Sequence, residues 1–236
     1  MGHLAASPHG VISEPLPDIF FVTGTREMHF NDIDWQFSRN MTIVREGDRL
    51  ILFNAVRLSD DGLKALEQLG RITDVVQVGG LHGADDAFYR DTFGATYWAQ
   101  PGAGQEGVPV DRELVEGGEL PVSDAQLFTF KTTKTPECIF RLDRDGGVMI
   151  ACDALQNYLN PDEFFSKDSA EMMAGMGFFT PANVGPVWMQ VSEPQAEDFQ
   201  RLSALEFRHV FCGHGAPVLG GASDAYKATF KRLFEF

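Results

Sequence analysis

Three apolar segments of this sequence each end at a side chain that can bind a metal ion, and this arrangement constrains the fold more than any other feature. The segments are 74–86, 147–153 and 208–215. Each has the pattern of a strand that feeds a polar loop at the edge of a sheet. Because functional sites are usually built on loops held by a rigid scaffold, we expect these distant loops to meet at one site.

The side chains at these strand ends have the chemistry of a metal site. They are His82, Asp85, Asp86, Asp153 and His214. Divalent metals of intermediate hardness bind imidazole and carboxylate oxygen, and a catalytic site needs about three protein ligands with one position open for water. Taken singly, a His beside glycines is usually a hydrogen-bonded loop residue, and an Asp after a strand is usually a turn or a helix cap. Their combination at separate strand ends indicates a metal site.

Length and charge restrict the class of protein and its partners. A chain of 236 residues with 44% hydrophobic residues can bury a sizeable core, and we expect one domain over 18–236 after a loose lead-in over 1–17. The formal net charge of -15 disfavours nucleic acid and anionic membrane surfaces, because these partners bind a basic face. We therefore expect a small-molecule substrate, no nucleic acid and no membrane, and the oligomeric state stays open.

The cysteines and the N-terminal segment indicate the compartment. Cys138, Cys152 and Cys212 are an odd number without CxxC spacing, which argues against a disulfide framework and against a thiolate zinc site. Residues 1–17 lack the basic start and apolar core of a secretion signal, and no window approaches the roughly 20 apolar residues of a membrane span. These features predict a reducing compartment, with the cytoplasm as the expected location.

Local patterns predict two β-rich blocks separated by alternating strands and helices. Predicted strands cover 18–23, 40–45, 49–54, 72–78, 96–99, 127–132, 138–142 and 148–152. Predicted helices cover 59–69, 86–93, 194–205 and 223–236, the third with Ser192 and Gln195 as a capping box. Residues 157–187 carry a stripe of Met and Phe, for which core packing is a better explanation than a binding surface, and a lid over the site is the other reading.

In the order of its elements and candidate ligands, the chain resembles the metallo-β-lactamase fold superfamily. That family has an HxHxDH loop after a strand, a later His in a stretch like TPGHTPGS, an Asp that ends a strand and a terminal His in a Gly-His-Gly-like turn. The 81–87 loop, Asp153 in CDAL and His214 in CGHGAP match the first, third and fourth of these places. The resemblance covers roughly 18–236 and implies an α+β fold, a four-layer αββα sandwich of two β-rich halves.

The first metal loop and the isolated His depart from the family pattern. With His82 as the first His, Asp86 takes the Asp place and two family ligands become alanine; in a shifted register, Asp85 and Asp86 stand for the adjacent Asp-His pair. Lys134 occupies the place of the isolated His, where an ammonium group does not ligate a metal at neutral pH. Lys134 is either a replacement for the lost metal charge that binds a substrate anion or a solvated lysine at a strand end.

The resemblance implies a metal-dependent hydrolase of a small molecule that the sequence does not identify. One divalent ion, which would be zinc, iron or manganese, would activate a water molecule. Its expected ligands are His82, Asp86, Asp153 and His214. Asp85 would orient or deprotonate the water, and Lys134 would bind the substrate. Two alternatives stay open: a metal-free, non-catalytic binding protein on the same fold, and an iron-dependent oxidoreductase, a class that the family also includes.

Overall fold

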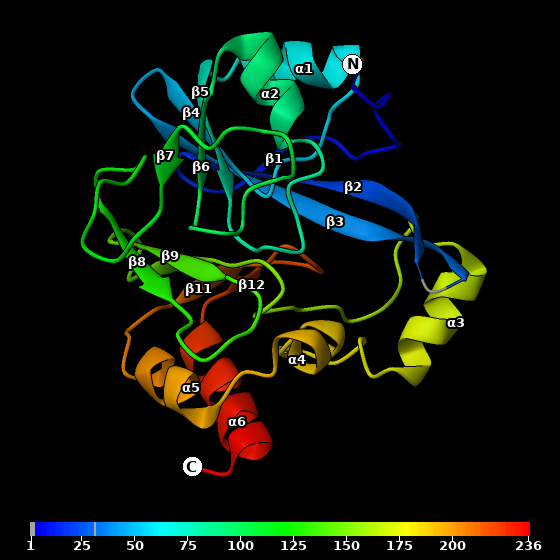
Figure 1. The fold of residues 1–236 in the computed structure, drawn as a ribbon, viewed down its shortest axis with the longest axis vertical. Coiled ribbons are helices and arrows are strands. Elements are labelled where there is room, and N and C mark those ends of the chain that lie inside the picture. The colour runs from blue at the N-terminus through cyan, green and yellow to red at the C-terminus, as the bar shows by residue number, and fades with distance from the viewer. Residues whose placement is uncertain (1–2, 31) are drawn as a thin grey trace.

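The chain folds into two stacked β-sheets, each covered by helices on its outer side. The computed structural model describes residues 3–30 and 32–236, and Figure 1 shows their arrangement. The first sheet has the strand order β1-β2-β3-β4-β5-β6-β7, and the second has the order β12-β11-β10-β9-β8.

The bounds of the elements follow the chain order. The strands of the first sheet are β1 (Ser13–Leu16), β2 (Ile19–Phe30), β3 (Ile33–Glu46), β4 (Arg49–Phe53), β5 (Arg71–Gln77), β6 (Thr96–Ala99) and β7 (Arg112–Glu113). Those of the second are β8 (Ala125–Thr129), β9 (Cys138–Leu142), β10 (Val148–Ile150), β11 (His209–Phe211) and β12 (Val218–Leu219). The helices are α1 (Asp60–Glu67), α2 (Asp86–Phe93), α3 (Lys167–Gly175), α4 (Pro186–Ser192), α5 (Ala196–Ser203) and α6 (Ala222–Phe234).

Alternating side chains divide the core into layers. In β2, Ile19 and Phe21 belong to the buried cluster between the two sheets, whereas Phe20 and Val22 belong to the cluster beneath α1 and α2. This alternation follows from the two-residue period of a strand, and here both faces are buried. A third buried cluster joins the second sheet to α4, α5 and α6, which lie below it in Figure 1. Three clusters between four layers make the αββα sandwich.

The β2–β3 hairpin is much longer than the sequence pattern predicts. The two strands pair continuously from Ile19 opposite Val44 to Phe30 opposite Ile33. The far half of the hairpin projects beyond the rest of the sheet, with α3 beside its end (Figure 1). Residues 33–38 alternate between apolar and polar side chains, which is a strand signal, but the prediction of strands at 18–23 and 40–45 captured only the inner part of the hairpin.

Two other segments differ from their predictions. Part of the expected loose lead-in forms strand β1, which pairs antiparallel with β2. The predicted capping box before α5 is wrong, because Ser192 is the last residue of α4 and the Gln195 side chain makes no capping hydrogen bond. In the Met and Phe stripe, Met173 and Phe178 pack in a buried cluster with Tyr158, as the core-packing interpretation expects. In the part of the chain that the structure describes, no helix has the length and apolar character needed to cross a bilayer.

The strand directions bring the candidate ligands to one edge of the sandwich. Strands β4, β5 and β6 are parallel to one another in the first sheet, and β10 and β11 are parallel in the second. Loops that follow parallel strands leave a sheet at the same edge, where α/β proteins commonly bind ligands. The loop after β5 carries His82, and the segments after β10 and β11 carry Asp153 and His214.

Candidate metal centre

His82, Asp153 and His214 converge although they lie far apart in the sequence. One donor atom from each lies within 4.8 Å of the donor atoms of the other two. The two imidazole Nε2 atoms are 3.0 Å apart. Asp153 Oδ2 lies 3.3 Å from His82 Nε2, and Asp153 Oδ1 lies 3.2 Å from His214 Nε2. Ligands about 2.0–2.2 Å from a shared ion have separations of this size, so the three residues fit a metal ion.

The orientation of His214 is set by the long hairpin. His214 Nδ1 lies 3.0 Å from the backbone oxygen of Ser38 in β3. A carbonyl oxygen only accepts hydrogen bonds, so Nδ1 carries the proton and Nε2 keeps its lone pair toward the cluster. The backbone nitrogen of Asn40 donates to Gly213 O at 2.8 Å, which binds the same strand to the His214 turn. Such outer contacts typically fix the tautomer of a metal-binding His.

A glycine lets the His214 turn approach its neighbour. Gly215 has a φ of 81°, and a Cβ at this position would lie 2.2 Å from the backbone of Asn157. An L-residue would therefore both strain the backbone and clash with it. This close approach explains why the Gly-His-Gly pattern contains its second glycine.

The loop that carries His82 is bound from two sides. Gln77 Nε2 donates to the backbone oxygens of His82 at 2.9 Å and of Ala103 at 2.7 Å. On the other side, Gly80 N donates to Pro136 O at 2.9 Å, which connects the loop to the chain just before β9. The two contacts hold a loop of the first sheet over the second sheet, where Asp153 and His214 lie.

Glu137 is a site residue that the sequence analysis did not single out. It is fully buried, and its Oε1 accepts a hydrogen bond from Ala154 N at 2.5 Å, directly after Asp153. Burial and the charge of Asp153 raise its pKa well above the ordinary value. Its place immediately before the apolar β9 strand gave no signal of this role, because strand alternation puts Cys138 and Phe140 between the sheets and assigns Glu137 to the opposite face.

His82 and Asp153 have the protonation that metal binding requires. Burial lowers the pKa of His82, and this effect outweighs the opposing charge of Asp153. Burial alone would raise the pKa of Asp153, but the adjacent His82 and His214 hold it well below its usual range. At neutral pH the cluster therefore offers a neutral imidazole at His82 and an ionised carboxylate, both of which are ligand forms.

The structure does not bring Asp85 and Asp86 into this cluster. Asp85 pairs with the guanidinium of Arg39, and its Oδ2 also accepts from Arg57 N at 2.7 Å. Asp86 begins α2 and is fully buried, and neither of its carboxylate oxygens has a hydrogen-bond partner among the described residues. The loop turns at Gly83, which has a φ of 102°, so the residues after it enter α2 instead of returning to His82.

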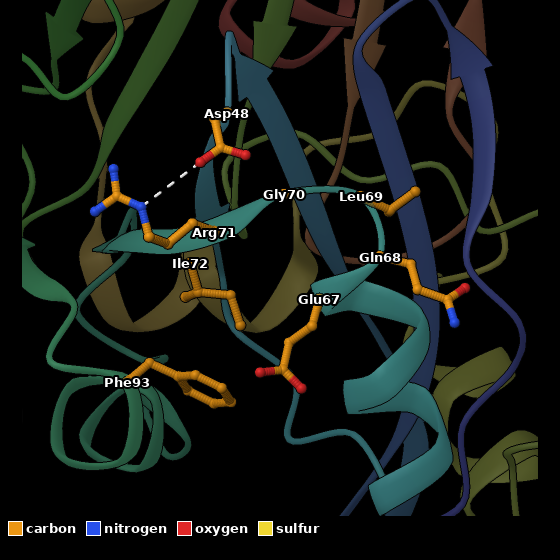
Figure 2. Close-up of a pocket in the computed structure, with 8 residues that line it drawn as sticks. All are labelled: Asp48, Glu67, Gln68, Leu69, Gly70, Arg71, Ile72 and Phe93. Atoms are coloured by element: carbon orange, nitrogen blue, oxygen red, sulfur yellow. Dashed lines mark ion pairs between the residues drawn. The ribbon is translucent and has the colours of Figure 1, made fainter.

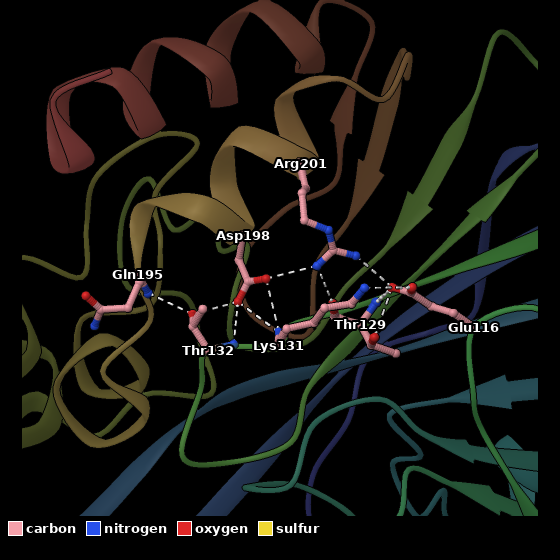
Figure 3. Close-up of polar contacts among 7 residues, drawn as sticks. All are labelled: Glu116, Thr129, Lys131, Thr132, Gln195, Asp198 and Arg201. Atoms are coloured by element: carbon pink, nitrogen blue, oxygen red, sulfur yellow. Dashed lines mark hydrogen bonds and ion pairs between the residues drawn. The ribbon is translucent and has the colours of Figure 1, made fainter.

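Lys134 points away from the metal centre, to the surface. Its side chain is 63% exposed and pairs with Glu193, and its backbone nitrogen donates to Ser192 O at 2.8 Å. The loop that carries it is held against α5 by Asp198, which accepts from the backbone nitrogens of Lys131 and Thr132 (Figure 3). The solvated interpretation of Lys134 therefore fits its position, and the metal-replacement interpretation does not.

The candidate metal centre opens into a hollow that is distinct from a larger hollow elsewhere on the molecule. A hollow of about 200 Å³ is lined by His82 and His214 together with side chains of the hairpin. A larger one of about 440 Å³, shown in Figure 2, lies around Gly70 and Arg71. Because Arg71 begins β5 and His82 follows its end, the larger hollow is at the opposite end of that strand and shares no residue with the metal cluster.

Comparison with known proteins identifies the fold. No protein-family model and no curated protein sequence matches the chain. Among solved structures, the mono-zinc form of the metallo-β-lactamase FIM-1 from Pseudomonas aeruginosa aligns with a TM-score of 0.60 and 13% identity over 98% of both chains. DIM-1 metallo-β-lactamase exposed to ceftazidime aligns with a TM-score of 0.60 and 11% identity over 94% of this chain and 96% of its own.

A third alignment agrees with these two. A metallo-β-lactamase from Erythrobacter litoralis has a TM-score of 0.57 and 12% identity over 94% of this chain and 92% of its own. The chain therefore has the metallo-β-lactamase fold, and the predicted α+β αββα sandwich is confirmed.

Proposed function

We propose that this metallo-β-lactamase-fold chain is a metal-dependent hydrolase of a small molecule, with one divalent ion held by His82, Asp153 and His214. The observation that carries the proposal is the convergence of these three donors within 4.8 Å at the edge of the sandwich. The mono-zinc state of FIM-1, a neighbour in fold, favours zinc as the ion. The 200 Å³ hollow beside the donors gives a small substrate access to the ion.

The ion would activate a water molecule, and the residues of the chain would hold the ion in place. A divalent ion in such a site lowers the pKa of a bound water from about 15.7 to about 7, which supplies a nucleophile at neutral pH. His214 is held in the ligating tautomer by Ser38 O, and His82 is held by the Gln77 contact to its backbone. Asp85 and Lys134 take no part in this proposal, because their charged groups pair with Arg39 and Glu193.

An iron-dependent oxidoreductase is the second candidate. Two His and one carboxylate around open positions are also the ligand set of non-haem iron(II) oxygenases. His82, Asp153 and His214 supply this set. The identity of the bound metal and its redox behaviour separate the two candidates, because zinc has no redox chemistry in proteins.

The direct test is the metal content of the purified protein after loading with zinc or iron(II) and removal of free ions. We expect about one ion per chain in the wild type, and loss of most of it in His82→Ala and in His214→Ala, each of which removes one of about three ligands. The matched control is His29→Ala, since the His29 side chain is 63% exposed and outside the cluster. The same proteins are then assayed for hydrolysis of small esters, thioesters and lactones.

The outcomes of this test are distinct. Metal bound equally by the wild type and by the His214→Ala variant would refute the site. Metal bound in the proposed way with no hydrolysis by the zinc form, but with oxygen consumption by the iron form, would favour the oxidoreductase instead.

The same proposal includes a reducing compartment such as the cytoplasm. Cys138, Cys152 and Cys212 are all buried and unpaired, which is the usual state of cysteines where thiols are kept reduced.

A further inference from the structure

One face of the β2–β3 hairpin forms a wall of the metal-site hollow. Arg26 lies opposite Phe37 in the strand register, and Arg39 lies two residues beyond Phe37 on the same strand. Residues two apart on a strand point to the same side, so Arg26, Phe37 and Arg39 share this face. All three line the hollow that His82 and His214 also line.

Arg26 has no direct polar contact for its guanidinium among the described residues. Its guanidinium makes no hydrogen bond and no ion pair with any of the residues that the structure describes, although the side chain is half-buried. Burial and the nearby Arg39 lower its pKa, and the charge of Asp85, which pairs with Arg39, opposes them. An arginine remains protonated in proteins, so a positive charge without a direct hydrogen bond or ion pair faces the hollow.

The neighbouring charges leave this wall positive. Arg39 is buried and pairs with Asp85, and its Nε is one of the buried nitrogens without a hydrogen-bond partner among the described residues. Arg57 lies beyond, with its guanidinium 4.1 Å from the centre of the Phe88 ring. A neighbouring hollow, of about 220 Å³, has five charged residues in its lining: Arg26, Arg39, Arg57, Glu27 and Asp85. Three guanidinium groups thus face two carboxylates, one of which already pairs with Arg39, in a chain whose net charge is -15.

We propose that Arg26 is an anion-binding site beside the metal centre, and that the substrate carries a carboxylate or phosphate group. The planar guanidinium binds both anions through paired hydrogen bonds. Phe37 and Met28 provide an apolar surface for the part of the substrate between the anion and the metal. The word substrate here rests on the proposed function, whereas anion binding by Arg26 does not.

The test is titration of the purified protein with phosphate and with acetate at constant ionic strength, followed by calorimetry. The wild type is compared with Arg26→Gln, Arg26→Lys and Arg71→Gln. Arg71 is a matched control, because it is exposed and lies at the distant hollow in Figure 2. We expect Arg26→Gln to raise the dissociation constant at least about tenfold, since a charge-assisted hydrogen bond is lost. Arg26→Lys keeps the charge but loses the planar fork, so its effect should be smaller.

The two anions and the metal content make the outcomes separable. A preference for acetate or for phosphate identifies which anion the site was built for. An equal dissociation constant in the wild type and in Arg26→Gln, with unchanged melting temperature, would overturn the anion site even if metal binding is normal. If the protein binds no metal after loading but still binds anions through Arg26, the anion site is supported and the proposed hydrolase is contradicted.

Discussion

At the residue scale, Asp86 is a buried acid without a compensating partner. It is fully buried, and among the described residues no group donates to either carboxylate oxygen. Burial and the charge of Asp85 raise its pKa to about 7, while the charge of Arg39 opposes this shift. Burial and the charge of Asp86 in turn raise the pKa of Tyr97 to about 12. Asp86 is therefore largely protonated in the folded protein below neutral pH.

This protonation predicts a pH dependence of stability. An Asp in the unfolded chain titrates near about 3.9, so between about pH 4 and pH 7 the folded state holds one more proton. Stability should fall as pH rises through this window and level off above it. Asp86→Asn keeps the group neutral, and we expect the fall in the free energy of unfolding to shrink by up to about 4 kcal/mol.

Denaturant unfolding at several pH values measures this difference. The exposed Asp224→Asn variant is the control, and Glu137 contributes equally to all three proteins. Parallel pH profiles for the wild type and Asp86→Asn would contradict the assignment.

The clustered residues could be predicted from the sequence, but not all of the site. His82, Asp153 and His214 were found because each follows an apolar strand, and strand direction alone brings such ends together. Asp85 and Asp86 follow the same strand but lie past the Gly83 turn, whose direction depends on packing against Gln77. Local sequence contains no signal for that direction.

At the element scale, one buried carboxylate accepts several hydrogen bonds from the loop between β8 and β9. Asp198 in α5 is 1% exposed and accepts from Lys131 N, Thr132 N and Thr132 Oγ1 at 2.9, 2.9 and 2.7 Å. Arg201 Nη1 donates to its Oδ1 at 3.0 Å (Figure 3). These contacts fix the direction in which Lys134 leaves the loop.

Asp198→Ala should therefore destabilise the protein, whereas Lys134→Ala should not. The first change removes the partly buried hydrogen bonds that the carboxylate accepts, each worth roughly 0.5–3 kcal/mol, so we expect a loss of about 2–4 kcal/mol. The second removes an exposed ion pair worth about 0–1 kcal/mol. Chemical denaturation of both variants measures the losses, and metal content should be unchanged in Lys134→Ala. A drop in metal content in that variant would restore Lys134 to the site.

Some elements with local signals were predictable, and others were not. Strand β6 and helix α2 have the predicted bounds, because the aromatic residues of β6 and the Gly94 stop are local signals. In the outer half of the β2–β3 hairpin the alternation at 33–38 was overlooked, and α4 was missed because it is short and begins at Pro186 without a capping side chain. The hairpin contains Arg26 and Arg39, so the anion site was missed with it.

At the scale of the whole molecule, the metal cluster connects the two halves of the sandwich. His82 follows β5 of the first sheet, whereas Asp153 and His214 follow β10 and β11 of the second. An ion bound by all three is thus a cross-link between the sheets, in addition to the apolar cluster that they share. Such an ion binds only the folded arrangement, so metal binding adds directly to the stability of the fold.

Removal of the ion should accordingly lower the melting temperature. At a metal concentration a hundredfold above the dissociation constant, the stabilisation is about 2.7 kcal/mol. For a domain of this size, that corresponds to a shift of about 5–10 °C. We expect this difference between zinc-loaded and chelator-treated protein at neutral pH, measured by differential scanning calorimetry, and we expect Asp153→Asn to reduce it because one anionic ligand is lost. His29→Ala, outside the cluster, should retain the full shift. Identical melting curves with chelator and with added zinc, manganese or iron would rule out a stabilising metal and favour a metal-free binding protein with this fold.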